Sequence, residues 1–445
     1  EKKQPVFVQV LPRAAVIAQE FKRLEQDSIL ETELQQQVDL EDEANDEQPV
    51  DVRMDPDSRK EKWTCLPIWH VPSQFTVKVC SAKQVVLPRS ESKKKGIGAS
   101  DTGTLYVAMG MYHGGPKGVL YECATREQPA DEIDAILWDE PLTTPLATKA
   151  MPRATVLSFT LMYKTSEDEP PRPVAWVNMH VFDHTGILVT GTRDLKMWPS
   201  DDEMANPIGT CVEDLESLNP MILTLEFDSH LDVFGRLGIP RLPICKYTWG
   251  ADTDTSASKR RQHASPHPEE VELLERLAAS DPLTQPSDDE KVLLYKYRHY
   301  LKDDPRALAK LMLAINWLDT DQIREARRML KQWAPLSPTQ ALDLLDARYA
   351  DLPVREHAVK CLEGISDTEL ELYMPQLIQT LKYDPYHVSA LSSFLMRRAL
   401  LAPSYIGHLF FWSLKAETHI VAIRERYSLL IDEFLRGCGM YRKQL

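Results

Sequence analysis

The sequence predicts a multidomain protein in which an antiparallel β-sandwich is followed by an all-α antiparallel helical solenoid. Three observations predict it. Apolar residues alternate with polar ones up to about residue 230, they recur at helical spacing from about residue 269 onward, and a polar segment separates the two regions. The 445 residues allow roughly three domains of ordinary size, and the hydrophobic content of 43% is enough for well-filled cores.

The β-rich region starts near Trp63. Its strands are connected by long polar segments without helices between them, which favours an antiparallel sandwich over a parallel sheet. Segments 89–103 and 128–153 are expected to be loops. The alternating apolar residues that mark strands lie at 75–79, 105–109, 157–161, 177–181, 195–197 and 223–227.

The helical pattern is clearest in residues 366–414, which predict three amphipathic helices. Asp384-Pro385 and Ala402-Pro403 supply the breaks between them, and Ser366 with Glu369 forms a capping-box pattern. Short turns between some ten helices favour antiparallel neighbours stacked as a solenoid. The other expected helices lie at about 269–279, 288–301, 305–315, 320–333, 338–349, 353–362 and 420–436.

Two polar segments flank the sandwich, which is assigned to residues 63–243. Residues 25–57 contain thirteen acidic residues and one arginine, and so carry twelve of the fifteen net negative charges. This tract is either a solvated linker or a docking segment for a basic partner. The Ser- and Pro-rich residues 244–268 are expected to link the sandwich to a helical domain at 269–445.

Composition favours a cytoplasmic protein. The seven cysteines are scattered without a CxxC pair, which favours a reducing compartment. No apolar run approaches the ~20 residues of a membrane span, and the charged start lacks the apolar core of a signal peptide. Membrane contact is therefore expected to be peripheral, and nucleic acid is not expected as a partner.

No catalytic constellation is recognisable. Residues 95–98 have a glycine pattern without a following strand and lysine in register, and residues 232–235 only superficially resemble a magnesium-binding Asp-Phe-Gly motif. The acidic residues in the sandwich loops lack the Asp-x-Asp pairing of a calcium site. We therefore expect no catalytic, cofactor-binding or metal-binding residue in these 445 residues.

Three stretches resemble the helical domain of phosphoinositide 3-kinase catalytic subunits, those of class I most closely: GHLFFWSLKAE (407–417), QTLKYDPYHVSALSSFLMRRAL (379–400) and DEFLRGCGMY (432–441). The resemblance extends upstream through VNMHVFDHTGILVTGTRDLKMWP (177–199). It implies that the sandwich is a C2-type domain and the solenoid a helical (PIK) domain. Residues 1–62 then contain the end of a preceding domain and, after it, the acidic linker. In the family, that preceding domain binds Ras. Pro375 departs from the family's usual apolar residue and is expected to weaken or kink its helix.

The resemblance also implies a function. Members transfer the γ-phosphate of ATP, with Mg²⁺, to the inositol 3-hydroxyl of phosphoinositides, using a kinase domain that is not recognisable in this chain. This portion would be a scaffold and regulatory segment. Its helical stack would support the kinase domain of the same chain, while its C2 domain would pack against an SH2-containing adaptor subunit and face the anionic plasma membrane. The alternative is a free-standing solenoid that binds a partner without catalysis.

Two groups of residues are candidates for contacts. Lys93, Lys94 and Lys95 are candidates for contact with anionic lipid headgroups, the alternative being a solvated loop. By resemblance, Asp288, Asp289 and Glu290 match an acidic site where class IA members bind a basic face of the adaptor's SH2 domain and are held inactive. Here Gln285 stands where the family often has an acid. The alternative is that Ser287 and Glu290 simply cap a helix, with acidic residues in its first turn.

Overall fold

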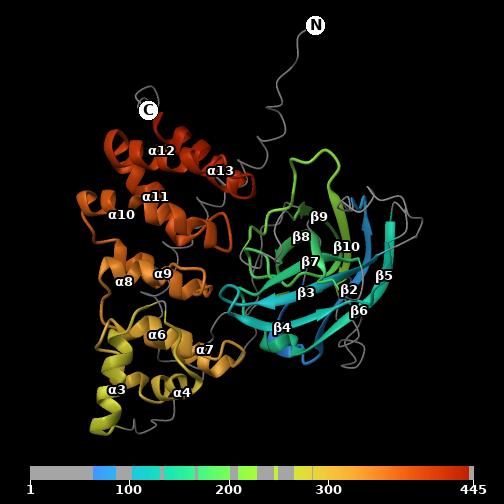
Figure 1. Ribbon diagram of the computed structural model, residues 1–445. Coiled ribbons are helices and arrows are strands. Elements are labelled where there is room, and N and C mark those ends of the chain that lie inside the picture. The colour runs from blue at the N-terminus through green and yellow to red at the C-terminus, as the bar shows by residue number, and fades with distance from the viewer. Residues whose placement is uncertain are drawn as a thin grey trace.

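The computed structural model places a β-domain beside a column of helices, in the predicted order (Figure 1). The described residues are 64–86, 103–130, 135–165, 169–200, 209–227, 245–248, 265–282 and 284–439.

The β-domain consists of two antiparallel sheets. One has the strand order β9-β10-β2-β6, the other has the order β4-β3-β7-β8 with β5 also paired to β3, and a two-residue pairing of β8 with β9 joins them at one edge. All six predicted strands are present. The strands are β2 (Gln74–Lys83), β3 (Thr104–Tyr112), β4 (Val119–Ala124), β5 (Gln128–Pro129), β6 (Ala135–Ala147), β7 (Val156–Lys164), β8 (Arg172–His180), β9 (Gly191–Pro199) and β10 (Met221–Phe227).

The apolar side chains that alternate with polar ones along each strand fill the space between the two sheets. Every second residue of β2 and β3 points inward, so that Phe75, Val77, Leu105 and Val107 are almost completely buried. Leu225 from β10 completes this layer. Burying a side chain of this size stabilises the fold by about 1.5–3 kcal/mol, so one period-two pattern accounts for both the strands and their packing.

The expectation that 128–153 is a loop was wrong, because this segment contains the 13-residue strand β6. The alternation of buried and exposed residues in β6 is interrupted at Asp139. This residue has a φ of 47°, and the register of β6 against β2 shifts next to it. Pro141 and Pro145 add two residues that are unusual in strands. Trp138 and Leu142 are nevertheless buried on the inner face. A bulge and edge prolines therefore concealed the strand period.

The start and the end of the β-domain meet in a third, small sheet. Strand β1 (Thr64–Pro67) pairs in parallel with β11 (Cys245–Thr248). Strand β11 lies in the segment expected to be a linker, so part of that segment has regular structure.

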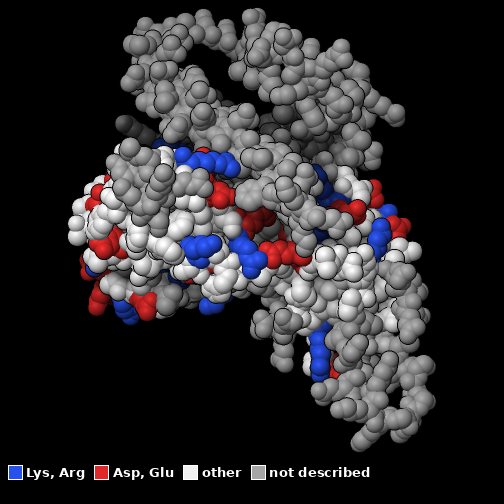
Figure 2. Space-filling model, turned by 90° about the horizontal axis from the view of Figure 1, so that it is seen from above, with Lys and Arg blue, Asp and Glu red and all other residues white. Residues whose placement is uncertain are grey.

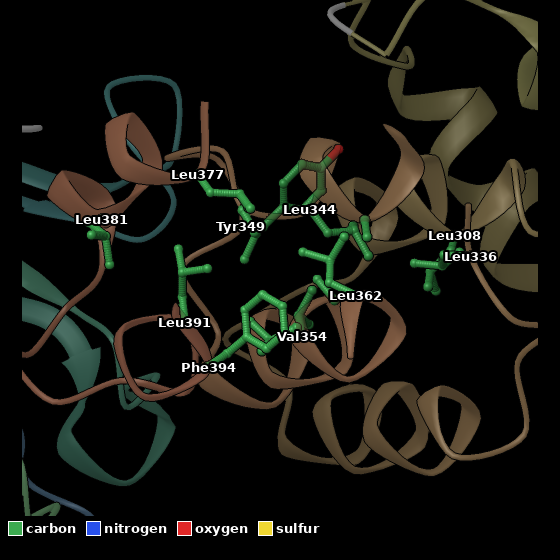
Figure 3. Packing of buried hydrophobic residues seen from close by; sticks show 14 of the residues in the cluster. Leu308, Leu336, Leu344, Tyr349, Val354, Leu362, Leu377, Leu381, Leu391 and Phe394 are labelled. Carbon is green, nitrogen blue, oxygen red and sulfur yellow. The ribbon is translucent and has the colours of Figure 1, made fainter. Parts of the chain in front are cut away.

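The helical column contains eleven described α-helices, stacked from α3 at one end to α12 and α13 at the other (Figure 1). Their apolar stripes form one continuous core, and Figure 3 shows its labelled members from Leu308 to Phe394. The helices are α3 (Pro268–Ala279), α4 (Asp288–Lys296), α5 (Arg298–Leu301), α6 (Ala307–Ala314), α7 (Thr320–Leu330), α8 (Pro338–Asp343), α9 (Leu352–Leu362), α10 (Asp367–Thr380), α11 (Ala390–Leu401), α12 (His408–Glu417) and α13 (Val421–Gly437).

Helix starts follow the local sequence closely. The capping box predicted at Ser366 is confirmed, since its hydroxyl accepts a hydrogen bond from the Glu369 N–H. Helix lengths were predicted less well. The expected helix 288–301 is divided at Tyr297 into α4 and α5, and the expected helix 338–349 ends at Asp343. Residues 403–407 form one π-helical turn that leads into α12.

Pro375 lies inside α10, which runs on to Thr380. Its ring is on the exposed side of the helix. The helical hydrogen bond that Pro375 removes would have reached the carbonyl of Glu371, which is also at the surface. Water can satisfy that carbonyl, and the helix continues through the proline.

Candidate functional site

Helix α4, with its acidic start, lies at the end of the column opposite α12 (Figure 1). Ser287 is its N-cap. The Ser287 hydroxyl accepts a hydrogen bond from the Glu290 N–H, and the Glu290 carboxylate accepts one at 2.8 Å from the Ser287 N–H. The predicted capping box is therefore confirmed, and the Glu290 carboxylate is occupied within its own turn.

The other two carboxylates of this turn differ from each other. Asp288, with a side chain that is 97% exposed, accepts a hydrogen bond from Lys291 at 2.8 Å, and this contact lowers its pKa. Asp289 is exposed and has no hydrogen bond or ion pair in the described part of the chain. Of the three predicted contact residues, Asp289 is thus the one whose carboxylate has no hydrogen-bond or ion-pair partner within this turn, so that its charge acts there only on the helix dipole.

A second site is the seam where the β-domain packs against the helical column. His113, in the turn between β3 and β4, is buried against Trp317 with ring centroids 5.0 Å apart. Next to it, Gly114 has a φ of 83°, and a Cβ atom there would lie 2.3 Å from the carbonyl oxygen of Arg348. Only glycine fits this position, because both the backbone conformation and the approach of the helical backbone exclude a side chain.

Two further contacts hold the seam near α13. The Tyr386 hydroxyl donates to the carbonyl of Phe182 at 3.0 Å, and its ring lies 5.2 Å from that of His180. Arg424 donates to both carboxylate oxygens of Glu216, at 2.7 and 2.8 Å. Both bonds of Arg424 come from one nitrogen, Nη1, in a partly exposed ion pair, so this contact fixes a distance more than an orientation, while the Tyr386 hydrogen bond and ring packing favour one arrangement of the two domains.

The seam encloses a cavity of about 80 Å³, lined by residues of both domains that include Tyr112, Cys211 and Arg426. Ligand pockets for organic cofactors are usually about 300–1,000 Å³. This cavity is suited to a few water molecules. Burial raises the pKa of the Cys211 thiol to about 12, so the cysteine stays protonated and has none of the thiolate character of a nucleophile.

Lowering the pH from 7 to 4.5 is expected to weaken the packing at the seam. Burial lowers the pKa of His113 to about 4, against the opposing influence of Asp351 and together with that of Arg327. Its imidazole nitrogens have no hydrogen-bond partner. The packed state therefore binds fewer protons than a separated one. Its full stability is present above pH 6.5, and up to about 3 kcal/mol is lost as the pH falls toward 4.

Thermal unfolding of the 445-residue chain at pH 7 and 4.5 measures this effect. His113→Gln removes one of two buried histidines at the seam, the other being His180, whose pKa burial also lowers to about 4; it should therefore reduce the pH dependence, whereas His419→Gln, at an exposed site, should not. Equal pH dependence in wild type and His113→Gln would contradict the assignment.

Lys93, Lys94 and Lys95 lie outside the described residues, as does the acidic tract 25–57. Figure 2 shows basic and acidic side chains interspersed over the described part of one face, without a continuous basic stripe there. Among the described helices, none combines the length and apolar character that a membrane span requires. Within the described part of the chain, no group of three or more His, Cys, Asp or Glu residues is arranged to hold a metal ion.

The seam contacts were not predicted from the sequence. Glycines and histidines in a β-turn give no hint of a packing partner more than 200 residues away in the chain. The sequence did give one signal of a contact elsewhere, inside the helical column. Lys310 interrupts the apolar stripe of α6, and its side chain is buried. A charged residue at a core position requires polar partners.

Comparison with known proteins agrees with this architecture. The family model for the phosphoinositide 3-kinase accessory domain (PIK domain) matches residues 262–445, and that for the phosphoinositide 3-kinase C2 domain matches residues 101–224. The most similar relatives include two proteins from Dictyostelium discoideum. Phosphatidylinositol 3-kinase 2 is 33% identical over 427 residues, covering 85% of this chain and 22% of the relative. Phosphatidylinositol 3-kinase 3 is 32% identical over 387 residues, covering 85% and 21%.

A third relative, phosphatidylinositol 3-kinase 1 of the same organism, is 37% identical over 273 residues, 61% of this chain and 17% of that protein. The chain thus spans about a fifth of the length of the curated relatives it matches. On its two matched domains, with the β-domain and helical column that the structure shows, this chain belongs to the phosphoinositide 3-kinase family, of which it holds the C2 domain and the PIK accessory domain.

Proposed function

We propose that this chain is the C2 and helical portion of a class I phosphatidylinositol 3-kinase catalytic subunit. The parent protein would transfer the γ-phosphate of ATP, with Mg²⁺, to the inositol 3-hydroxyl of a phosphoinositide. The observation that carries the proposal is the match of two consecutive segments to two domain models of this one family. The alternative, a free-standing solenoid without catalysis, has no observation in its favour.

The role of this portion is that of a scaffold. The helices share one continuous core, and the seam is held by the ion pair of Arg424 with Glu216 and by the ring contact of Tyr386 with His180. Together these features would support the kinase domain of the same chain. The partners in this proposal are that kinase domain, an SH2-containing adaptor, the anionic plasma membrane and, through the region upstream of the C2 domain, Ras. The protein is cytoplasmic and is recruited to the membrane peripherally.

The acidic start of α4 is the proposed contact with a basic face of the adaptor. Support comes from exposure and from charge. Asp288 and Asp289 are both exposed, and Asp289 has no partner within the described residues. A basic partner would gain their attraction without first breaking the capping box, which belongs to Ser287 and Glu290.

Lys93, Lys94 and Lys95 are proposed to contact anionic lipid headgroups. Lysines near an anionic surface contribute about 1 kcal/mol each. Co-sedimentation of the 445-residue chain with vesicles containing phosphatidylserine should therefore fall when all three are changed to serine. Equal sedimentation of the triple variant would leave the loop without a role in binding.

The 445-residue chain is expected to have no lipid-kinase activity of its own, whereas the full-length protein phosphorylates phosphoinositides. The physical reason is that phosphoryl transfer needs a phosphate-covering loop, a lysine for the phosphates and a magnesium-binding aspartate, and no such set is recognisable in the sequence. Turnover of radiolabelled ATP on phosphoinositide vesicles measures both proteins. An inactive full-length protein would contradict the proposed function, and magnesium-dependent activity of the shorter chain would contradict this expectation.

A further inference from the structure

The segment that leads into the acidic start of α4, residues 280–287, accepts hydrogen bonds from a buried lysine of the helical column. Lys310 lies in α6 and is 3% exposed. Its ammonium group donates to the carbonyl oxygen of Asp281 at 2.6 Å and to that of Thr284. Hydrogen bonds from a charged donor are about twice as strong as neutral ones, so this lysine is a strong anchor for the segment.

A second cation binds the same segment. The Arg348 guanidinium, which follows α8, donates to the carbonyl oxygen of Pro282 at 2.9 Å. Its orientation is fixed by a further bond at 2.9 Å to the carboxylate of Asp346. Three carbonyls within four residues thus accept hydrogen bonds from two side chains of the column.

Apolar packing holds the end of this segment, where Pro286 is buried, but does little to hold residues 280–282. A cavity of about 270 Å³ lies between α3, α6 and α8, and Ser280 and Pro282 form part of its lining together with Lys310. Side chains that line a void lose contacts on that side. The position of the segment therefore depends on the hydrogen bonds from Lys310 and Arg348.

Arg348 also touches the C2 domain, through its backbone. The Gly114 backbone approaches the carbonyl of Arg348 so closely that no side chain fits between them. The turn at 113–118 is closed by the hydrogen bond from the His113 N–H to the Gly118 carbonyl, at 2.8 Å, so it moves as a unit. One residue of the column is thus in contact with the C2 domain on one side and with the segment before α4 on the other.

We propose that Lys310 and Arg348 are positioning residues for the acidic start of α4, and that Arg348 couples this site to the packing of the C2 turn at 113–118. When the C2 turn is packed, Arg348 holds Pro282 and the carboxylates of Asp288 and Asp289 are presented in a fixed position. When it is displaced, the segment loses one of its two anchors. The inference rests on the proposed function in one respect, which is that the acidic start is a contact for a basic partner.

Amide hydrogen exchange of the 445-residue chain tests the coupling without any partner. Gly114→Ala should displace the C2 turn, and the hydrogen-bonded amides within residues 284–290, those of Thr284, Ser287 and Glu290, should then exchange about tenfold faster, as expected on loss of one charge-assisted hydrogen bond. Arg348→Met and Lys310→Met should have the same effect while leaving the C2 domain unchanged. Unaltered exchange in β7 and β8 shows that the C2 domain of Gly114→Ala is still folded.

Matched controls are available in the same chain. Gly191 also has a positive φ, of 74°, but a Cβ there would meet nothing within 4 Å, so Gly191→Ala should leave residues 284–290 protected. Arg306 lines the same cavity but, among the residues that the structure describes, its guanidinium donates only to Asp304, so Arg306→Met should also have no effect.

Two results would overturn the proposal. Unchanged exchange at 284–290 in Arg348→Met and Lys310→Met would show that these residues do not position the segment. Unchanged exchange in Gly114→Ala alone would show that the C2 turn is not coupled to it. Neither result bears on whether a basic partner binds the acidic start, which charge reversal at Asp289 tests separately.

Discussion

Replacing Arg355 by methionine is expected to lower the free energy of unfolding of the helical domain by about 3–5 kcal/mol, as is usual when one partner of a buried ion pair is removed. Arg355 and Asp384 are only 4% and 5% exposed. The guanidinium pairs with the Asp384 carboxylate, which also accepts a hydrogen bond from the Ser389 hydroxyl. Methionine would leave this buried carboxylate without the guanidinium that pairs with it, although the charge of Arg426, which also interacts with Asp384, would remain.

The same arginine also satisfies the backbone of two other turns. It donates to the carbonyl of Leu345 at 2.8 Å, after α8, and to that of Thr380 at 3.4 Å, at the end of α10. One side chain in α9 thereby joins the ends of two neighbouring helices to the start of α11. Its loss is therefore expected to affect the whole middle of the column and not a single helix.

Urea unfolding followed by circular dichroism at 222 nm measures the change. Arg397→Met is the matched control, because Arg397 pairs with Glu363 at the surface, with side-chain exposures of 57% and 49%. Exposed pairs of this kind contribute about 0–1 kcal/mol. The double variant Arg355→Met with Asp384→Leu should recover part of the loss, since it removes the unpaired charge. If Arg355→Met were as stable as Arg397→Met, the ion pair of Arg355 with Asp384 would not contribute to the stability of the helical domain.

How much the sequence could predict depended on whether the cause was local. The strands at 75–79 and 157–161 and the helix starts at Ser287 and Ser366 were predicted correctly, because alternation and capping are properties of a few adjacent residues. Strand β6 was missed, since its period is broken by a bulge at Asp139 and by prolines. Local patterns fail where a partner strand, and not the segment itself, sets the geometry.

The same distinction applies to the candidate site. The acidic residues 288–290 were named as contact candidates through the family resemblance, while the capping serine placed them in the first turn of a helix, and the structure adds that of these three carboxylates only that of Asp289 has no partner among the described residues. The position of Lys310 in the apolar stripe of α6 indicates that it needs polar partners, but the carbonyls that Lys310 and Arg348 bind could not be found, because backbone carbonyls have no sequence signature. Such contacts depend on tertiary packing and become visible only in the fold.

Reversing the charge of Asp289 to lysine is expected to raise the basal lipid-kinase activity of the full-length enzyme with its adaptor several-fold. An attractive contact becomes repulsive, and a loss of about 1.4 kcal/mol already weakens binding about tenfold. Stability should change little, because no interaction of Asp289 within the described part of the chain is broken. Asp288→Lys should also activate, but it additionally breaks the ion pair with Lys291.

The two controls separate partner binding from helix capping. Ser287→Ala removes the cap, costs about 1 kcal/mol of stability and leaves every acidic charge in place, so it should lower the melting temperature without activating. Asp321→Lys makes the same charge change at the equivalent first-turn position of α7, where the side chain is 91% exposed. Lysine at either position is unfavourable to the helix dipole by about 0.3–1 kcal/mol, so any activation confined to Asp288 and Asp289 must come from the partner. If both of these variants keep wild-type basal activity while the adaptor remains bound, the acidic turn serves only to start α4.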